Sequence, residues 1–218
     1  MGYTAIKIRI GNSWGFDSEP KRSDIATVKA VREAVGDQIE LRVDANNAYT
    51  PHTAIRLGRA LEEYGVFHFE EPIHASDWQG LKEVSTALDL PIAAGESHST
   101  RFSLKELISN RAVDIIQPDP LTSGGYTECR KIAAMAEVWE MPCTLHQSWP
   151  TLSTVINLHF AAATPNCLYA QEYVVESHPL RDVLLTEPLQ PKDGYLKVPE
   201  GPGLGVEVNE EVIKGQIL

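Results

Sequence analysis

Three features are scarce or absent in this 218-residue sequence, and each one excludes a class of protein. The three cysteines have no CxxC spacing, so neither a disulfide framework nor a zinc knuckle is predicted. No apolar run reaches the roughly 18 residues that span a bilayer, and we expect no leader peptide. Bases number 19 against 30 acids, a formal charge of −11, which disfavours a broad phosphate-binding surface. We therefore expect a cytoplasmic protein with no nucleic acid and no membrane as partners.

What the sequence does contain is a regular alternation of strand and helix patterns. A period-two run predicts a strand at 4–10, and the alternation of strand and helix continues with strands at 39–44, 66–70, 91–94, 113–117, 142–145 and 168–171. Between them, apolar residues at helical spacing predict helices at 19–35, 51–64, 78–88, 104–110, 126–140 and 152–163. We expect one domain of seven strand-helix units over residues 1–178, and a proline- and glycine-rich tail over residues 179–218 that packs on it.

The alternation itself restricts the fold. Each crossover must carry the chain back to the same end of the sheet, so the strands are expected to be parallel. An open, doubly wound sheet would carry a glycine-rich dinucleotide fingerprint after an early strand, but residues 10–14 offer one glycine where three are wanted. The prediction is an α/β fold of the (β/α)8, TIM-like barrel type.

Polar side chains stand near the end of each predicted strand, at nearly equal intervals. Steps of 26 residues join Asp44, Glu70 and Glu96, and steps of 23, 27 and 26 lead on to Asp119, His146 and Glu172. Any one of them could be a solvated loop residue or a helix N-cap. In a barrel, however, the carboxyl ends of all strands meet at one mouth, so residues in this register converge on one site.

Three consecutive strands would then bring three carboxylates together, and these would repel one another without a cation among them. A ligand set of oxygen atoms alone selects a hard ion, and Mg²⁺ also keeps positions for substrate oxygens. Glu71 is an alternative to Glu70, but neighbours on a strand point to opposite faces, so only one of them faces the site. The sequence thus favours a magnesium site.

Five strand-end motifs resemble those of the mandelate racemase subgroup of the enolase superfamily: VDAN at 43–46, FEEP at 69–72, AGE at 94–96, QPD at 117–119 and LH at 145–146. The resemblance implies that Mg²⁺ is held by Asp44, Glu70 and Glu96. It also implies that His146 is a catalytic base oriented by Asp119, and that Glu172 hydrogen-bonds a substrate carboxylate as it becomes an enediolate. The motif at the last strand is looser, so Gln171 remains an alternative to Glu172.

The first strand departs from the subgroup, which has Lys-x-Lys where this sequence has Lys7-Ile8-Arg9. Arginine stays protonated, so Arg9 suits binding of a substrate carboxylate or hydroxyl, a role we also expect for Asn46. Lys7 could titrate if it is buried beside Arg9. Racemisation requires a base on each face of the carbanion, whereas dehydration requires one. We therefore expect an acid-sugar dehydratase acting on a small-molecule carboxylate.

Two other functions stay open: a racemase or epimerase of a 2-hydroxy acid, and an inactive metal-binding barrel fragment. The resemblance implies an amino-terminal capping domain and a first barrel strand that this sequence does not include. Unpaired edges at the strands of Lys7 and Glu172 would then pair with another chain, so we expect a homo-oligomer. For His68 and His98, a core or loop role and a contact with the site are both open.

Overall fold

The structure, a computed structural model, describes residues 2–11, 22–175 and 178–215. Its strands are β1 (Ala5–Arg9), β2 (Glu40–Asp44), β3 (Val66–Glu70), β4 (Ile92–Ala94) and β5 (Ile115–Ile116). Its helices are α1 (Arg22–Val35), α2 (Pro51–Glu62), α3 (Trp78–Ala87), α4 (Thr100–Ser109), α5 (Gly125–Val138), α6 (Leu152–Ala162) and α7 (Glu210–Lys214). The predicted start of the first helix, at residues 19–21, lies outside the described residues. None of the described helices is long and apolar enough to cross a membrane.

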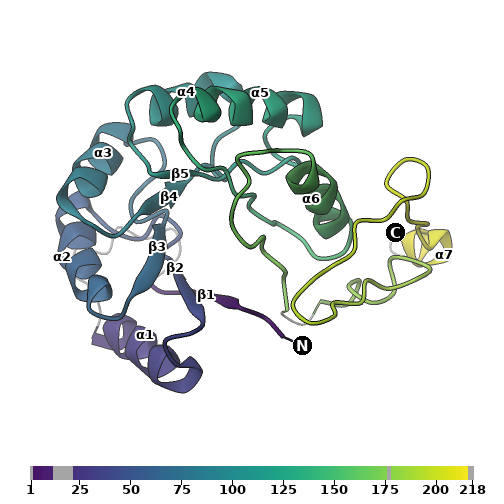
Figure 1. The fold of residues 1–218 in the computed structure, drawn as a ribbon, viewed down its shortest axis with the longest axis horizontal. Coiled ribbons are helices and arrows are strands. Elements are labelled where there is room, and N and C mark those ends of the chain that lie inside the picture. The colour runs from purple at the N-terminus through teal and green to yellow at the C-terminus, as the bar shows by residue number, and fades with distance from the viewer. Residues whose placement is uncertain (1, 12–21, 176–177, 216–218) are drawn as a thin grey trace.

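The strands form a single parallel sheet in the order β1-β2-β3-β4-β5, which confirms the predicted α/β class with a parallel sheet. The sheet is curved, and α1 to α5 lie along its outer side (Figure 1). Its register pairs Arg9 with Asp44 and Asp44 with Glu70. Because the strands are parallel, their carboxyl ends share one edge, and the residues at the ends of β1, β2 and β3 lie side by side there.

Local signals explain where the helices begin. Thr50 caps α2 by accepting a hydrogen bond from the backbone N–H of Thr53, and Pro51 occupies the first turn, where its missing N–H costs nothing. Asp77 caps α3 in the same way through the N–H of Gly80. Each cap stands a few residues beyond the sheet edge. The turns between strand and helix are therefore short and fixed, as a site built on them requires.

The two sides of the sheet differ in chemistry. Leu41, Val43 and Phe69 are fully buried in the apolar layer that the sheet shares with the outer helices. The concave side instead carries polar and charged side chains, among them the buried Arg42 and His68. An interior of this kind is stable only where each polar group has a partner, so the concave side is organised by ion pairs and hydrogen bonds.

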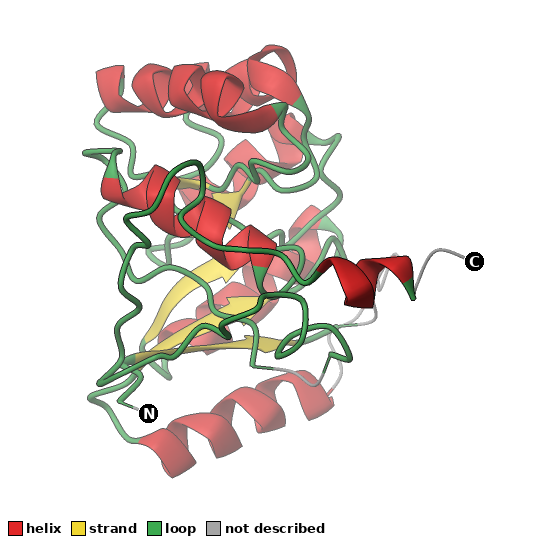
Figure 2. Ribbon diagram, turned by 90° about the vertical axis from the view of Figure 1, so that its right-hand side faces the viewer, coloured by secondary structure: helices red, strands yellow, loops and turns green. Residues whose placement is uncertain are grey.

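The prediction of seven strands is wrong for the last two. Residues 142–145 make one isolated bridge, between Ile116 and Cys143, and residues 168–171 form no strand. Figure 2, viewed from the side of α6 and α7, shows green loops in front of the yellow strands. The N–H of Leu145 bonds to the side chain of Gln171 instead of to a neighbouring backbone carbonyl, so the ladder is not continued. The chain still follows the sheet here, since the N–H of Thr144 donates to the carbonyl of Ile116 at 3.0 Å.

The tail after residue 178 is mostly irregular, apart from the short helix α7, which the sequence analysis did not anticipate. An isolated antiparallel bridge joins Leu185 to Val208. His159 of α6 contacts the tail, its Nε2 lying 3.0 Å from the carbonyl oxygen of Leu204. The tail is thereby attached to the last helix of the strand-helix series.

Candidate active site

The three candidate metal ligands converge at the carboxyl edge of the sheet. The ammonium of Lys7 lies 2.7 Å from Oε1 of Glu70 and 3.9 Å from Oδ2 of Asp44. The side-chain amide of Asn46 donates to Asp44 Oδ2 and to Glu96 Oε1, both at 3.4 Å. One ammonium and one amide thus connect carboxylates from three successive strand ends, which we call the carboxylate cluster (Asp44, Glu70 and Glu96).

The pKa values in the cluster show how much negative charge it concentrates. Burial, with the nearby charges of Glu71, Glu70 and Asp44, raises the pKa of Glu96 to about 10. Burial and the charge of Glu70 raise the pKa of Asp44 to about 6. Burial also opposes ionisation of Glu70, but its contact with the ammonium of Lys7 lowers the pKa well below its ordinary range. One lysine therefore compensates only part of the charge.

The cluster fits a hard divalent cation in its chemistry, because its donors are all carboxylate oxygens and its charge is under-compensated. In the part of the chain that the structure describes, no three acidic, histidine or cysteine side chains already stand in a coordinating arrangement. The carboxylates are held instead by Lys7, Asn46 and His146. Coordination of one ion by all three would require these side chains to change their orientation.

His146 and Asp119 form the predicted pair. Nδ1 of His146 lies 3.0 Å from Oδ2 of Asp119, and Nε2 lies 3.1 Å from Oε2 of Glu96, so the ring spans from Asp119 to the carboxylate cluster. Burial alone would lower the pKa of His146, but its hydrogen bond to Asp119 and the charge of Glu172 raise it. Asp119 is fully buried, and hydrogen bonds from His146, Ser148 and Leu121 lower its pKa against the effect of burial.

At the last predicted strand, the structure places Glu172 toward the cluster. Its Oε1 lies 2.5 Å from the ammonium of Lys7, and its Oε2 accepts the backbone N–H of Gln147 at 3.0 Å. The side chain of Gln171 bonds to backbone groups instead: it accepts a hydrogen bond from the N–H of Leu145 and donates one to the carbonyl of Tyr169. Of the two alternatives, Glu172 is the one that reaches the candidate site.

The two basic residues of β1 occupy different depths. Burial opposes the charge of Lys7, but Glu70, Glu172 and Asp44 raise its pKa well above the ordinary range, so it remains an ammonium. Arg9 is exposed and donates from Nη2 to Oδ1 of Asn46 at 2.6 Å. Lys7 therefore lies among the carboxylates and compensates part of their negative charge, while the guanidinium of Arg9 lies at the exposed edge of the site, its rim.

Sequence reasoning overlooked two neighbours of the site. Gln117 donates from Nε2 to Oε2 of Glu70 at 3.1 Å, and Ser148 donates its hydroxyl to Oδ2 of Asp119. Both stand two residues from a predicted site residue, Gln117 before Asp119 and Ser148 after His146. The period-two alternation of extended chain gave the signal that could have found them. His68, which is 1% exposed, also contacts the cluster, with its Nε2 3.5 Å from Oε2 of Glu70.

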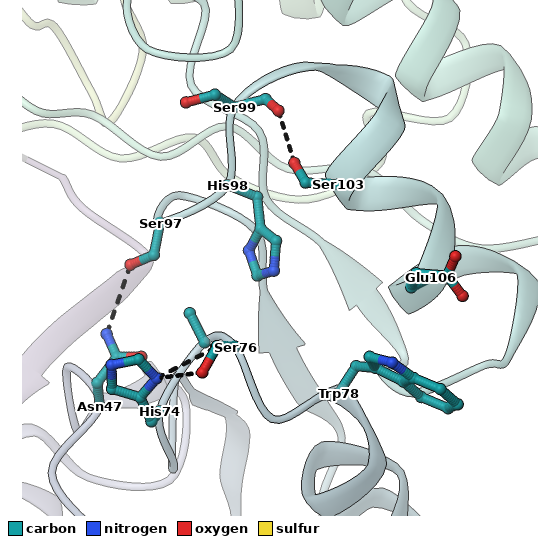
Figure 3. Close-up of a pocket in the computed structure, with 10 residues that line it drawn as sticks. Asn47, His74, Ser76, Trp78, Ser97, His98, Ser99, Ser103 and Glu106 are labelled. Carbon is teal, nitrogen blue, oxygen red and sulfur yellow. Dashed lines mark hydrogen bonds between the residues drawn. The ribbon is translucent and has the colours of Figure 1, made fainter.

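A cleft of about 650 Å³ lies beside the candidate site, between the loops that follow β3 and β4 (Figure 3). It is lined by Asn47, His74, Ala75, Ser76, Trp78, Ser97, His98, Ser99, Ser103 and Glu106. None of the nine predicted site residues is among them. His98 projects into the space between the two loops in Figure 3, and burial lowers its pKa. We therefore place His98 in this cleft and not in the carboxylate cluster.

Comparison with known proteins identifies the family. The sequence profile described as "Enolase C-terminal domain-like" matches residues 1–212. The arabinonate dehydratase of Saccharolobus solfataricus is 37% identical over 98% of this chain and 55% of its own length. The D-galactarolactone cycloisomerase of Agrobacterium fabrum is 33% identical over 97% of this chain and 56% of its own. The crystal structure of a mandelate racemase/muconate lactonizing enzyme from Sulfitobacter sp. superimposes with a TM-score of 0.89 at 33% identity, covering 98% of this chain and 55% of that one.

The chain belongs to the enolase C-terminal domain-like family, as the resemblance of its strand-end motifs predicted. Its relatives include enzymes named as dehydratases of arabinonate, D-xylonate, D-gluconate and D-galactonate, which are lyases. The chain spans about half the length of the relatives it matches.

Proposed function

We propose that this chain carries the catalytic barrel of a Mg²⁺-dependent acid-sugar dehydratase. The proposal rests on the orientation of the His146 side chain. Its Nδ1 contacts Asp119, and its Nε2 contacts Glu96 of the carboxylate cluster. A histidine fixed in this way is a general base pointed at the place where a metal-bound substrate would lie. The relatives named as sugar-acid dehydratases support the substrate class.

The proposal includes a finer description of the fold. Residues 1–178 would form the greater part of a (β/α)8-type barrel, to which a capping domain and one further strand-helix unit belong, with residues 179–218 as a tail. The order of site residues around the sheet supports it. The proposal also includes assembly as a homo-oligomer. Light scattering on the purified protein would test the assembly, and a monomer would contradict it.

The chain's own residues suit the binding of a sugar acid. Asp44, Glu70 and Glu96 would hold Mg²⁺, which when bound stabilises the negative charge that develops on the substrate carboxylate. Arg9 and Asn46, already hydrogen-bonded to each other, would bind a carboxylate or hydroxyl group at the rim. The retained ammonium of Lys7 adds positive charge beneath the same position.

Proton transfer falls to His146. When the Nδ1–H group of His146 donates a hydrogen bond to Asp119, Nε2 is the unprotonated nitrogen and can accept the proton alpha to the substrate carboxylate. The resulting imidazolium then returns that proton to the β-hydroxyl, which leaves as water as the C–O bond breaks and the Cα–Cβ double bond forms. The enol product tautomerises to a 2-keto acid. Glu172 would hydrogen-bond the substrate carboxylate while its charge increases, from the position it holds beside Lys7.

Racemisation fits this geometry less well. It needs a second base on the opposite face of the carbanion, and Lys7 of β1 is a basic residue that contacts the carboxylate cluster. Its carboxylate neighbours keep Lys7 protonated, so it cannot readily accept a proton. One functional base favours elimination of water.

The test is incubation of the purified protein with Mg²⁺ and a panel of aldonic and aldaric acids, with measurement of 2-keto acid formation. The expected result is keto product from at least one acid when the capping domain and the further strand-helix unit are present, with little turnover by residues 1–218 alone, and loss of the product when EDTA removes the metal. Deuterium exchange at the alpha carbon in D₂O without keto product would indicate a racemase or epimerase instead. No exchange and no product with any acid of the panel would indicate an inactive metal-binding barrel.

A further inference from the structure

A second set of polar side chains lies behind the carboxylate cluster, on the same three loops. The amide of Asn47 donates both to the carboxylate of Glu71 and, at 3.4 Å, to the hydroxyl of Ser97. Asn47 is 4% and Glu71 1% exposed. Figure 3 shows the bond between Asn47 and Ser97 at the side of the cleft, where both residues contribute to the lining. We call these three residues the rear cluster (Asn47, Glu71 and Ser97).

Each member of the rear cluster is tied by the chain to a member of the carboxylate cluster. Glu71 directly follows Glu70, and Ser97 directly follows Glu96. Because these residues are adjacent along the backbone, the bonds among Asn47, Glu71 and Ser97 restrict the spacing of the loops that carry Glu70 and Glu96. Asn47 has the same relation to the loop that begins at Asp44. The rear cluster therefore sets the distances among three loops.

The backbone is bent to bring Glu71 to this place. Glu71 has φ of 38° and Asn47 has φ of 64°, in the left-handed region that glutamate in particular rarely occupies. The conformation is held by backbone bonds from Glu71 N to Ala93 O at 2.9 Å and from Asn47 N to Glu71 O at 2.8 Å. A strained turn maintained by several bonds indicates that the direction of the Glu71 side chain matters.

The same geometry indicates that Glu71 is not one of the metal ligands. Glu70 contacts Lys7 and Gln117 on the concave side, whereas the carboxylate of Glu71 turns to Asn47. We propose that Glu71 is a positioning residue: through Asn47 and Ser97 it fixes the spacing of the loops that carry Asp44, Glu70 and Glu96, and so tightens metal binding. The inference rests on the proposed function, because it takes the carboxylate cluster as the metal site.

The test compares Glu71→Ala with Glu71→Gln, using Mn²⁺ as the probe and electron paramagnetic resonance to measure its dissociation constant. Loss of an outer partner of a metal ligand weakens metal binding on the order of 10- to 100-fold, and this is expected for Glu71→Ala. Glu71→Gln keeps an oxygen that accepts from Asn47, so it should bind Mn²⁺ nearly as the unmodified protein does. Glu106→Ala is the matched control, since it removes a carboxylate from the same cleft without touching the rear cluster.

The free energy of unfolding of each variant, measured in EDTA, separates positioning from a purely structural role. A Glu71→Ala protein that is less stable but binds Mn²⁺ with unchanged affinity would overturn the inference. Equal losses of affinity in Glu71→Gln and Glu71→Ala would also overturn it, because charge and not the hydrogen bond would then be responsible. Absence of Mn²⁺ binding in the unmodified protein would overturn the proposed metal site together with this inference. Binding without any dehydration would count against the proposed reaction alone.

Discussion

The two halves of the candidate site are built in different ways. The carboxylate cluster comes from β2, β3 and β4, where a parallel ladder pairs Asp44 with Glu70 and continues into β4. His146 and Glu172 come from the segments 142–148 and 168–173 on either side of α6, which the structure shows as irregular chain with a single isolated bridge to the sheet. We call these the ladder half (β1 to β5) and the extended half (residues 142–148 and 168–173).

In the extended half, side chains form hydrogen bonds to backbone groups that a neighbouring strand would otherwise bond. Asn157 of α6 donates to the carbonyl of His146 at 2.9 Å, Gln171 accepts the N–H of Leu145, and Glu172 accepts the N–H of Gln147. The groups proposed to hold a metal therefore stand on a regular backbone, and the groups proposed to move a proton depend on individual amides and carboxylates. Metal binding and proton transfer should accordingly respond to different substitutions.

The largest effect is expected from His146→Asn. The variant removes the proposed base from the extended half and leaves the ladder half unchanged. Exchange of the alpha proton, followed by deuterium incorporation from D₂O, should fall about 100- to 10,000-fold. The dissociation constant for Mn²⁺ should change little. His98→Asn is the matched control because His98 lies in the adjacent cleft. Exchange that persists in His146→Asn would assign the base to Lys7.

The second largest effect is expected from Arg42→Met, which removes a hydrogen bond between the two halves. Arg42 of β2 is 3% exposed and donates from Nη1 to the carbonyl of Ala170 at 2.8 Å, with Phe67 beneath its guanidinium. Arg42→Met keeps the apolar stem but removes this hydrogen bond together with the ion pair to Glu40, so unfolding should become easier by about 2 kcal/mol. Chemical denaturation measures this change. The exposed Arg59→Met should differ by less than about 0.5 kcal/mol, and an equal loss in both would remove the proposed link.

A smaller effect is expected within the extended half. Gln171→Leu preserves the size of the side chain but leaves the buried N–H of Leu145 without its acceptor, at a cost of about 1–2 kcal/mol in the free energy of unfolding. Gln79→Leu, at an exposed position of α3, is the control for the change in side chain. If Gln171→Leu proved as stable as the control, the side chain of Gln171 would not be replacing a ladder bond.

The smallest effect is a difference in thiol reactivity. Burial, with the charges of Asp119 and Glu128, raises the pKa of Cys129 to about 12. A hydrogen bond from Cys143 lowers the pKa of the partly exposed Cys167, so Cys167 holds more of the reactive thiolate at pH 8. Iodoacetamide should label Cys167 first, and faster as the pH rises, as followed by mass spectrometry. Labelling of Cys129 at an equal rate would show that the native packing differs.

Much of the ladder half could be predicted from the sequence. Period-two alternation located β1, the alternation of strand and helix patterns located β2 to β4, and the parallel register then places the residues at strand ends together, as with Asp44 and Glu70. The extended half was only partly predictable. Its segments were located, but the pattern could not show that the side chain of Gln171 replaces a backbone partner, since that depends on a contact between distant residues.

The rear cluster could not be predicted for a different reason. The alternation of a strand indicates that Glu70 and Glu71 point to opposite faces, but not that the backbone at Glu71 takes a positive φ and turns its carboxylate to Asn47. A similar constraint at Gly95 has a clearer cause. A Cβ there would lie 2.8 Å from the backbone of Gln117, so only glycine allows the chain to pass from β4 to Glu96.

The contact between Arg42 and Ala170 also bears on the order of folding. It closes a loop of 128 residues, whereas each strand of the ladder half pairs with the next strand along the chain. Contacts between distant residues carry a larger entropy cost and form more slowly. We expect the ladder half to become protected from hydrogen exchange first, so the carboxylate cluster would form in the nascent protein before His146, its proposed catalytic partner, is in place.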